Sequence, residues 1–128
     1  MRTETVRPAI YKQNLAKEFL TPERCFILEN YNLDLDPGVS IARARIRPYV
    51  TTARHVVKST VERYLVVEGT GWVEIEGLPP TEVSPGDIVV IPPDTPQRIS
   101  NPGNRDLIFY CICTPRFQSA NYQALETD

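Results

Sequence analysis

The chain has 128 residues, which is enough for one domain and too few for two well-packed ones. Hydrophobic residues make up 41% and charged residues 23%, an ordinary globular composition that argues against disorder. The formal net charge of -2 excludes a strongly basic surface, and no apolar run is long enough to cross a membrane. We therefore expect neither a nucleic-acid nor a membrane partner.

The cysteines and the first residues bear on the compartment. The N-terminal stretch MRTETVRPAIYKQ lacks the apolar core of a secretory signal. The three cysteines form no C-x-x-C pair, so we expect free thiols in a reducing cytoplasm. Cys111 and Cys113 are two residues apart and therefore share one strand face. The simplest interpretation is that they pack as small hydrophobic residues, and the alternative is that they are soft metal ligands. Cys25 has no evident role.

Short apolar runs separated by turn residues predict an all-β protein. The 12 prolines are nearly twice the usual share of about 5% and stand between the runs. The expected strands, in chain order, are Cys25–Tyr31, Val39–Arg47, Glu62–Glu68, Trp72–Glu76, Ile88–Ile91, Gln97–Asn101 and Leu107–Cys113. This spacing favours a β-sandwich or barrel, without choosing between immunoglobulin-like, jelly-roll and other β folds.

The segments outside these strands carry weaker signals. Residues Tyr11–Leu20 have room for one or two helical turns, and Ser119 is placed to cap a short final helix carrying Tyr122 and Leu125. We therefore expect an N-terminal extension over residues 1–24, a barrel over 25–115 and a C-terminal tail over 116–128. Within the barrel, Val39–Arg47 alternates strictly, and its stripe of Arg43, Arg45 and Arg47 reads as a solvated face or a dimer rim.

Two segments narrow the choice of fold. Residues 55–69 read HVVKSTVERYLVVEG, and residues 86–101 read GDIVVIPPDTPQRISN. Their spacings from Glu62 to Gly69, from Gly86 to Pro92 and from Pro92 to Asn101 resemble the two signature motifs of the cupin superfamily. The resemblance implies a double-stranded β-helix, a jelly-roll-like barrel, in which two His, a Glu and a later His bind one divalent metal.

The sequence departs from the family pattern at several positions. His55 and Glu62 match the first His and the Glu, whereas Val57 stands at the second His and Gln97 at the last. Tyr49 and Asp94 replace two glycines of the motifs.

The resemblance thus implies a metal site made by His55, Glu62 and Gln97. One imidazole, one carboxylate and one amide oxygen form an open ligand set that suits Zn²⁺, Ni²⁺, Mn²⁺ or Fe²⁺, and Val57 cannot donate to a metal. A site without metal is the alternative.

Each candidate residue also has a plainer interpretation. His55, the single histidine, is otherwise a structural or solvated side chain, and Gln97 a surface polar residue. Glu62 shares a strand face with Tyr64 and Val66, and the resemblance turns this face toward the cavity, where a buried carboxylate needs a partner. The alternative for Glu62 is a solvated barrel rim. Tyr64 is either a proton donor in the pocket or a packing aromatic.

Three functions follow from these residues. The first is a small-molecule cupin whose metal polarises a carbonyl or hydroxyl group, with Glu62, His55 or Tyr64 as acid–base groups, in isomerase, epimerase, cyclase or lyase chemistry. The second is the same chemistry without metal, through His55 and Glu62. The third is a ligand-binding or structural module without catalysis. The resemblance also implies a homodimer, for which Cys25–Leu28 and Leu107–Cys113 are the candidate surfaces.

Overall fold

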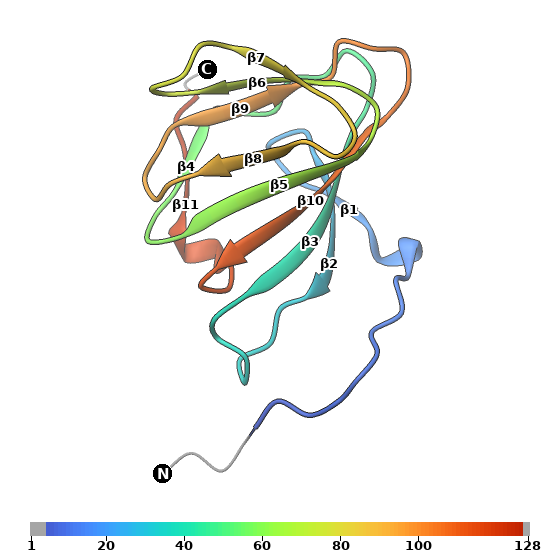
Figure 1. Cartoon of the computed structure of the whole chain (residues 1–128), viewed down its shortest axis with the longest axis vertical. Coiled ribbons are helices and arrows are strands. Elements are labelled where there is room, and N and C mark those ends of the chain that lie inside the picture. Colours follow the sequence, from blue (N-terminus) through green and yellow to red (C-terminus); the bar gives the residue numbers. More distant parts are fainter. Residues whose placement is uncertain (1–4, 127–128) are drawn as a thin grey trace.

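The computed structural model describes residues 5–126 and is almost entirely β-structure (Figure 1). It contains two short 3₁₀ helices, η1 (Leu15–Lys17) before the first strand and η2 (Ser119–Asn121) before the last. The strands are β1 (Phe19–Leu20), β2 (Phe26–Tyr31), β3 (Ser40–Ile46), β4 (His55–Val57), β5 (Val61–Glu68), β6 (Gly71–Ile75), β7 (Thr81–Val83), β8 (Ile88–Ile91), β9 (Gln97–Ser100), β10 (Leu107–Thr114) and β11 (Tyr122–Ala124). No helix in this described part is long and apolar enough to cross a bilayer.

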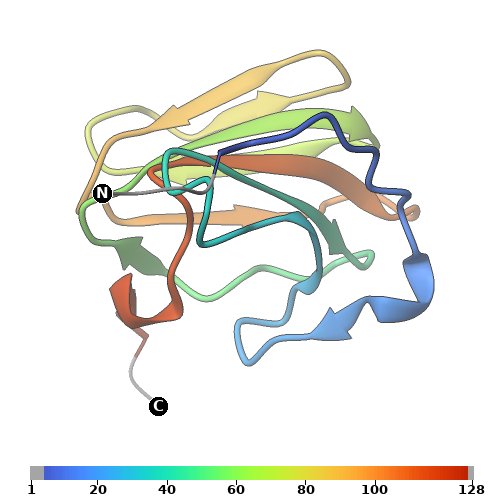
Figure 2. The same ribbon diagram turned by 90° about the horizontal axis from the view of Figure 1, so that it is seen from below.

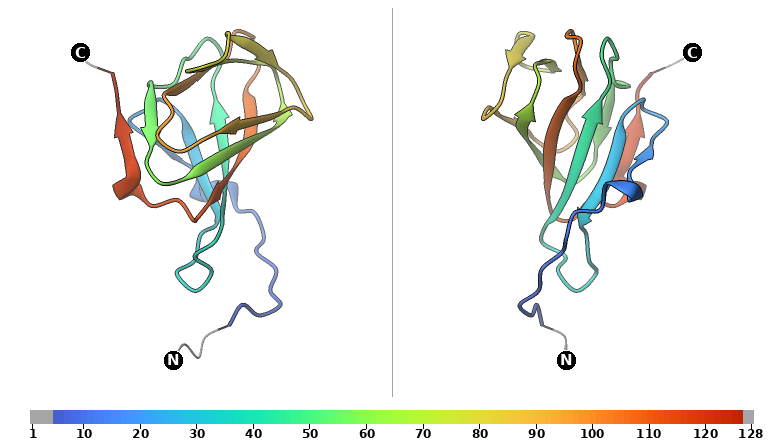
Figure 3. Two further views of the ribbon diagram at one scale, coloured as in Figure 1. Left: turned by 60° about the vertical axis from the view of Figure 1, so that its left-hand side comes forward. Right: turned by 90° about the vertical axis from the view of Figure 1, so that its right-hand side faces the viewer.

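The strands form two antiparallel sheets that face each other. The larger sheet has the order β1-β2-β3-β10-β5-β8, and the smaller has the order β11-β4-β9-β6-β7. Figure 3 shows the two sheets from two sides, with the strands wrapping into a barrel. The expected all-β, jelly-roll-like architecture of a double-stranded β-helix is therefore confirmed.

Alternation along the strands produces the core. In β5, Glu62, Tyr64 and Val66 are buried, whereas Val67 is exposed, so the predicted inward face is the correct one. β10, which is apolar on both faces, lies between β3 and β5 at the centre of the larger sheet. The core between the sheets is formed mainly by Ile46, Val66, Val73, Ile75, Ile91, Ile99, Leu107 and Phe109.

The motif residues at the turns have structural roles. Tyr49 and Asp94, which stand where the family has glycine, both adopt left-handed backbone conformations, with φ of 64° and 59°. The buried Asn101 donates to the carbonyls of Ile46 and Arg105 and accepts from the Gly103 amide. The motif thus fixes the turns even where its glycines are missing.

Both ends of the chain add strands beyond residues 25–115. β1 pairs with β2, and β11 pairs with β4. Figure 2 shows β1 and the C-terminal segment on the same side of the barrel. The predicted final helix is limited to one 3₁₀ turn, η2, which has no side-chain cap. The residues from Tyr122 onward form a strand instead, because Tyr122 pairs with Val57 of β4.

The arginine stripe of β3 is not a solvated face. Arg43 and Arg45 both donate to the carboxylate of Glu18, and Arg45 also contacts Asp106. The N-terminal segment therefore covers these side chains, and only Arg47 of the stripe is exposed. The alternation of β3 was predicted correctly. It could not identify Glu18, which lies 25 residues before Arg43, as the acidic partner.

Candidate functional site

A cavity of about 430 Å³ lies between the two sheets and contains most of the candidate residues. Its wall is mainly apolar, with side chains of β2, β3, β5 and β10 on one side and of β4, β9 and β11 on the other. The polar and titratable side chains that line it are Thr21, Glu23, Cys25, Glu29, Ser40, Thr52, His55, Glu62, Tyr64, Cys111, Cys113, Ser119 and Tyr122. A cavity of this size and lining is typical of sites for small organic ligands.

Glu62, Gln97 and Tyr64 are joined by hydrogen bonds. The Gln97 amide nitrogen donates to Oε1 of Glu62, and the Tyr64 hydroxyl donates to the Gln97 amide oxygen. Since the amide nitrogen donates to the Glu62 carboxyl group, the amide oxygen is turned toward the Tyr64 hydroxyl. Burial, reinforced by the charge of Glu62, raises the pKa of Tyr64 well above its ordinary value, so this hydroxyl stays protonated.

His55 lies beside this group on β4, where its backbone is opposite Gln97. The ring is buried, with Nδ1 2.9 Å from the Ala53 carbonyl oxygen and a stacked contact to Tyr122 at 4.9 Å between ring centroids. A carbonyl only accepts hydrogen bonds, so the neutral ring carries its proton on Nδ1, which leaves the lone pair on Nε2. Both His55 and Glu62 line the cavity.

Glu23 is a site residue that the sequence did not reveal. It lies between β1 and β2, and its Oε2 is 3.5 Å from Nδ1 of His55. That oxygen is buried and has no hydrogen-bond partner among the described residues. Burial raises the pKa of Glu23, and the nearby His55 opposes this effect. No motif marks Glu23, because it lies before the two matching segments. The turn between β1 and β2 brings it to the cavity.

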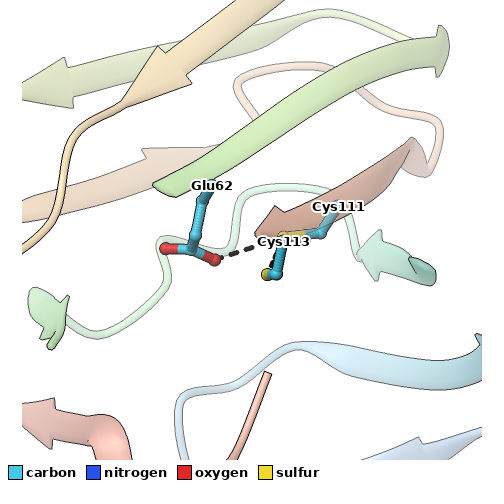
Figure 4. A group of neighbouring side chains, drawn as sticks. All are labelled: Glu62, Cys111 and Cys113. Carbon is cyan, nitrogen blue, oxygen red and sulfur yellow. Dashed lines mark hydrogen bonds between the residues drawn. The ribbon is translucent and has the colours of Figure 1, made fainter. Parts of the chain in front are cut away.

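Cys111 and Cys113 lie next to Glu62 on the cavity wall (Figure 4). The Cys111 thiol donates to Oε2 of Glu62 at 3.2 Å, and the two sulfur atoms are 3.7 Å apart. In register, Cys113 stands directly opposite Glu62 across β10 and β5. The hydrogen bond with Cys113, followed by burial, raises the pKa of Cys111. The predicted shared face is confirmed, but its contact with Glu62 depends on a strand register that the sequence does not specify.

The residues at the family's ligand positions do not fit a four-ligand metal site. Val57 offers no ligand atom, and both ends of the Gln97 amide are already hydrogen-bonded. A metal on His55, Glu62 and Gln97 stays a prediction, in which the Gln97 oxygen would bind the ion through its second lone pair or give up its contact with Tyr64. In contrast, Glu62, Cys111 and Cys113 place three possible ligand atoms within 4.8 Å of one another.

Comparisons with known proteins agree with this architecture. An uncharacterized protein of Methanocaldococcus jannaschii is 30% identical over 112 residues, which cover 86% of this chain and 89% of the relative. KdgF from Halomonas sp. has a TM-score of 0.74 at 17% identity, over 85% of this chain and 96% of that chain. Pac13 of Streptomyces, a nucleoside dehydratase, has a TM-score of 0.73 at 13% identity, over 92% of each chain.

The two solved structures share the fold at low identity. The sequence profile of the Cupin domain matches residues 43–113, which is more than half of the chain and includes both motifs. Together with the barrel and the similarity to the archaeal relative, this match shows that the chain belongs to the cupin family.

Proposed function

We propose that this cupin binds a small organic molecule in the cavity between its sheets and moves a proton on that molecule. The observation that carries the proposal is that His55, Glu23 and Glu62 all line one largely apolar cavity of about 430 Å³. Titratable side chains gathered in a largely apolar cavity are the kind of groups that general acid–base catalysis uses. The reaction class is that of isomerases, epimerases, cyclases and lyases.

His55 and Glu62 are the candidate acid–base residues. Nε2 of His55 holds the free lone pair, and Glu23 lies behind the ring at Nδ1, where it stabilises the charge that develops when Nε2 takes a proton. Glu62 offers a second carboxylate to the same ligand. Tyr64 acts through Gln97, because its hydroxyl donates to the amide that holds Glu62. We therefore treat Tyr64 as a positioning residue.

The activity of one structurally similar protein is compatible with this reaction class. Pac13 is a nucleoside dehydratase, and removal of water requires proton transfer. The likeness supports the barrel as a scaffold for such chemistry and does not identify the substrate of this chain.

Solvent deuterium incorporation tests the proposal. A panel of sugars, sugar phosphates, hydroxy acids, keto acids and polyketide-like compounds is first screened by thermal shift, because a ligand of the native state raises the melting temperature. Each stabilising compound is then incubated with the protein in D₂O and followed by NMR. We expect deuterium at a carbon of at least one compound, and at least a hundredfold slower exchange with Glu62→Gln or His55→Gln.

Glu82→Gln is the matched control, because it makes the same change on an exposed strand residue. It should exchange deuterium at the wild-type rate. Compounds that raise the melting temperature but neither exchange nor react would contradict the proposal and favour a binding module without catalysis.

A further inference from the structure

The cluster of Glu62, Cys111 and Cys113 is not explained by acid–base chemistry alone. Two thiols and a carboxylate converge from β10 and β5 on the cavity wall (Figure 4). We propose that these three side chains bind a thiophilic divalent cation such as Zn²⁺, with one coordination position open to the cavity. In the metal-bound protein Glu62 is a ligand and His55 is the remaining acid–base residue, and the test of metal binding does not depend on the proton transfer proposed above.

The distances in the cluster match tetrahedral coordination. Two thiolates bound to zinc at about 2.3 Å, with tetrahedral angles, lie about 3.8 Å apart. The Cys111 and Cys113 sulfur atoms are 3.7 Å apart. A thiolate and a carboxylate oxygen on the same ion lie about 3.6 Å apart, and the Cys111 sulfur lies 3.2 Å from Oε2 of Glu62. The third separation, from the Cys113 sulfur to the Glu62 carboxylate, is at most 4.8 Å, and side-chain rotation closes it around the ion.

The surroundings of Glu62 favour a ligand role. Oε1 accepts from the Gln97 amide, whereas Oε2 faces the thiols. Gln97 is in turn fixed by the Tyr64 hydroxyl. Hydrogen bonds of this kind orient the ligands of metal sites and leave one carboxylate oxygen available to the ion.

The strand geometry disfavours a disulfide as the alternative role of the thiol pair. Residues two apart on a strand have Cα atoms about 6.8 Å apart, at the upper end of the range of about 4.4–6.8 Å that disulfides span. β10 is hydrogen-bonded to β3 on one side and β5 on the other, so it cannot shorten easily.

The ligand chemistry selects the class of cation. Thiolates favour zinc and similar soft or borderline ions over magnesium or calcium, which prefer oxygen ligands. On binding, the two S–H bonds break, two metal–sulfur bonds form and two protons pass to solvent. Three protein ligands leave the fourth position open for water or a ligand in the cavity, as in catalytic zinc sites.

Cobalt(II) is the probe for the test, since it replaces zinc and reports its ligands by absorption. Metal-free, reduced full-length protein is titrated with Co²⁺, and then with Zn²⁺. We expect one Co²⁺ per chain, a thiolate-to-cobalt charge-transfer band, tetrahedral d–d bands, and loss of all of them when Zn²⁺ is added. Cys111→Ser and Cys113→Ser should each weaken binding at least a hundredfold and reduce the charge-transfer band.

Cys25→Ser is the matched control, because Cys25 is a buried thiol on the same cavity but outside the cluster. It should bind Co²⁺ like the wild type, whereas Glu62→Gln should weaken binding at least tenfold and keep the charge-transfer band. Cobalt binding without a charge-transfer band, or equal loss in Cys25→Ser, would overturn the site.

A second measurement does not require variants. Zn²⁺ should protect Cys111 and Cys113, but not Cys25, from alkylation in partly unfolded wild-type protein, as read by peptide mass spectrometry. Equal alkylation of all three thiols with and without Zn²⁺ would also overturn the site. Neither result depends on deuterium exchange, so failure of one proposal leaves the other standing.

Discussion

Tyr64, Gln97 and Glu62 show how single side chains hold the candidate site together. In Tyr64→Phe the buried Gln97 oxygen loses its donor, and an unpaired buried acceptor costs about 1–3 kcal/mol. We expect the free energy of unfolding in urea to fall by that amount. Tyr49→Phe, whose side chain is exposed, should change it by less than about 0.5 kcal/mol. Equal effects of the two substitutions would contradict the hydrogen-bonded chain.

Glu23 has a pKa raised by burial, which predicts a pH-dependent stability. A carboxyl whose folded-state pKa lies above its unfolded value contributes fully at low pH, and that contribution is lost as pH rises through the folded pKa. Glu23→Gln removes the ionisation, so the stability of the variant relative to the wild type should rise as pH goes from acid to neutral. Urea unfolding across this pH range measures the difference. A stability difference that stays the same, or falls, over this pH range contradicts the assignment.

The sequence was informative about single residues only where a motif covers them. His55, Glu62 and Gln97 were identified from spacing within the two motifs. Glu23 was not, because nothing local distinguishes a carboxyl that reaches a cavity through a loop. Cys111 and Cys113 were correctly placed on one face, yet their contact with Glu62 depends on the register of β5 against β10.

At the scale of elements, Glu18 fastens the N-terminal segment to β3. Hydrogen bonding from Arg45 lowers the pKa of Glu18 from its ordinary value of 4.5. A lowered folded-state pKa stabilises the fold above that value, and the gain is lost as pH falls through the folded pKa. Glu18→Gln should therefore cost about 1 kcal/mol near neutral pH and less in acid. Urea unfolding at the two pH values checks this, and a cost independent of pH contradicts it.

The turn between β5 and β6 requires glycine for two reasons. Gly69 has a φ of 77°, and a Cβ there would lie 2.6 Å from the Asp106 carbonyl oxygen. Gly77 also has positive φ, but a Cβ there meets nothing within 4 Å. Gly69→Ala should therefore cost about 1–3 kcal/mol more than Gly77→Ala, because it adds a clash to the same backbone strain. Thermal unfolding compares the two, and similar melting temperatures would show that the contact is unimportant.

Strands that are long or strictly alternating were predictable, whereas very short ones were not. Val39–Arg47 and Ile88–Ile91 correspond closely to β3 and β8. β4, β7 and β11 have three residues each, too few for a period of two to stand out. The capping residue Ser119 favours a short helix here, but the pairing of β11 with β4 prevails over that local signal.

For the whole molecule, the two motifs predicted the architecture better than the strand count did. Strand spacing left several β folds open, and the motif spacings selected the barrel. The homodimer stays a prediction. Parts of both predicted surfaces are buried within the chain (Cys25, Leu28, Leu107, Ile108, Phe109 and Cys113), whereas Ile88 and Val90 on the edge strand β8 are 65% and 57% exposed.

If the chemistry takes place in the cavity between the sheets, His55, which lines that cavity, must respond to the reacting compound. His55 is the only histidine in the chain, so its imidazole NMR signals need no assignment. A compound that undergoes deuterium exchange should shift these signals at saturation, in the wild type and in the control Glu82→Gln alike. Exchange or turnover of a compound at saturation, with the His55 signals unchanged, would place the chemistry outside this cavity and contradict the account.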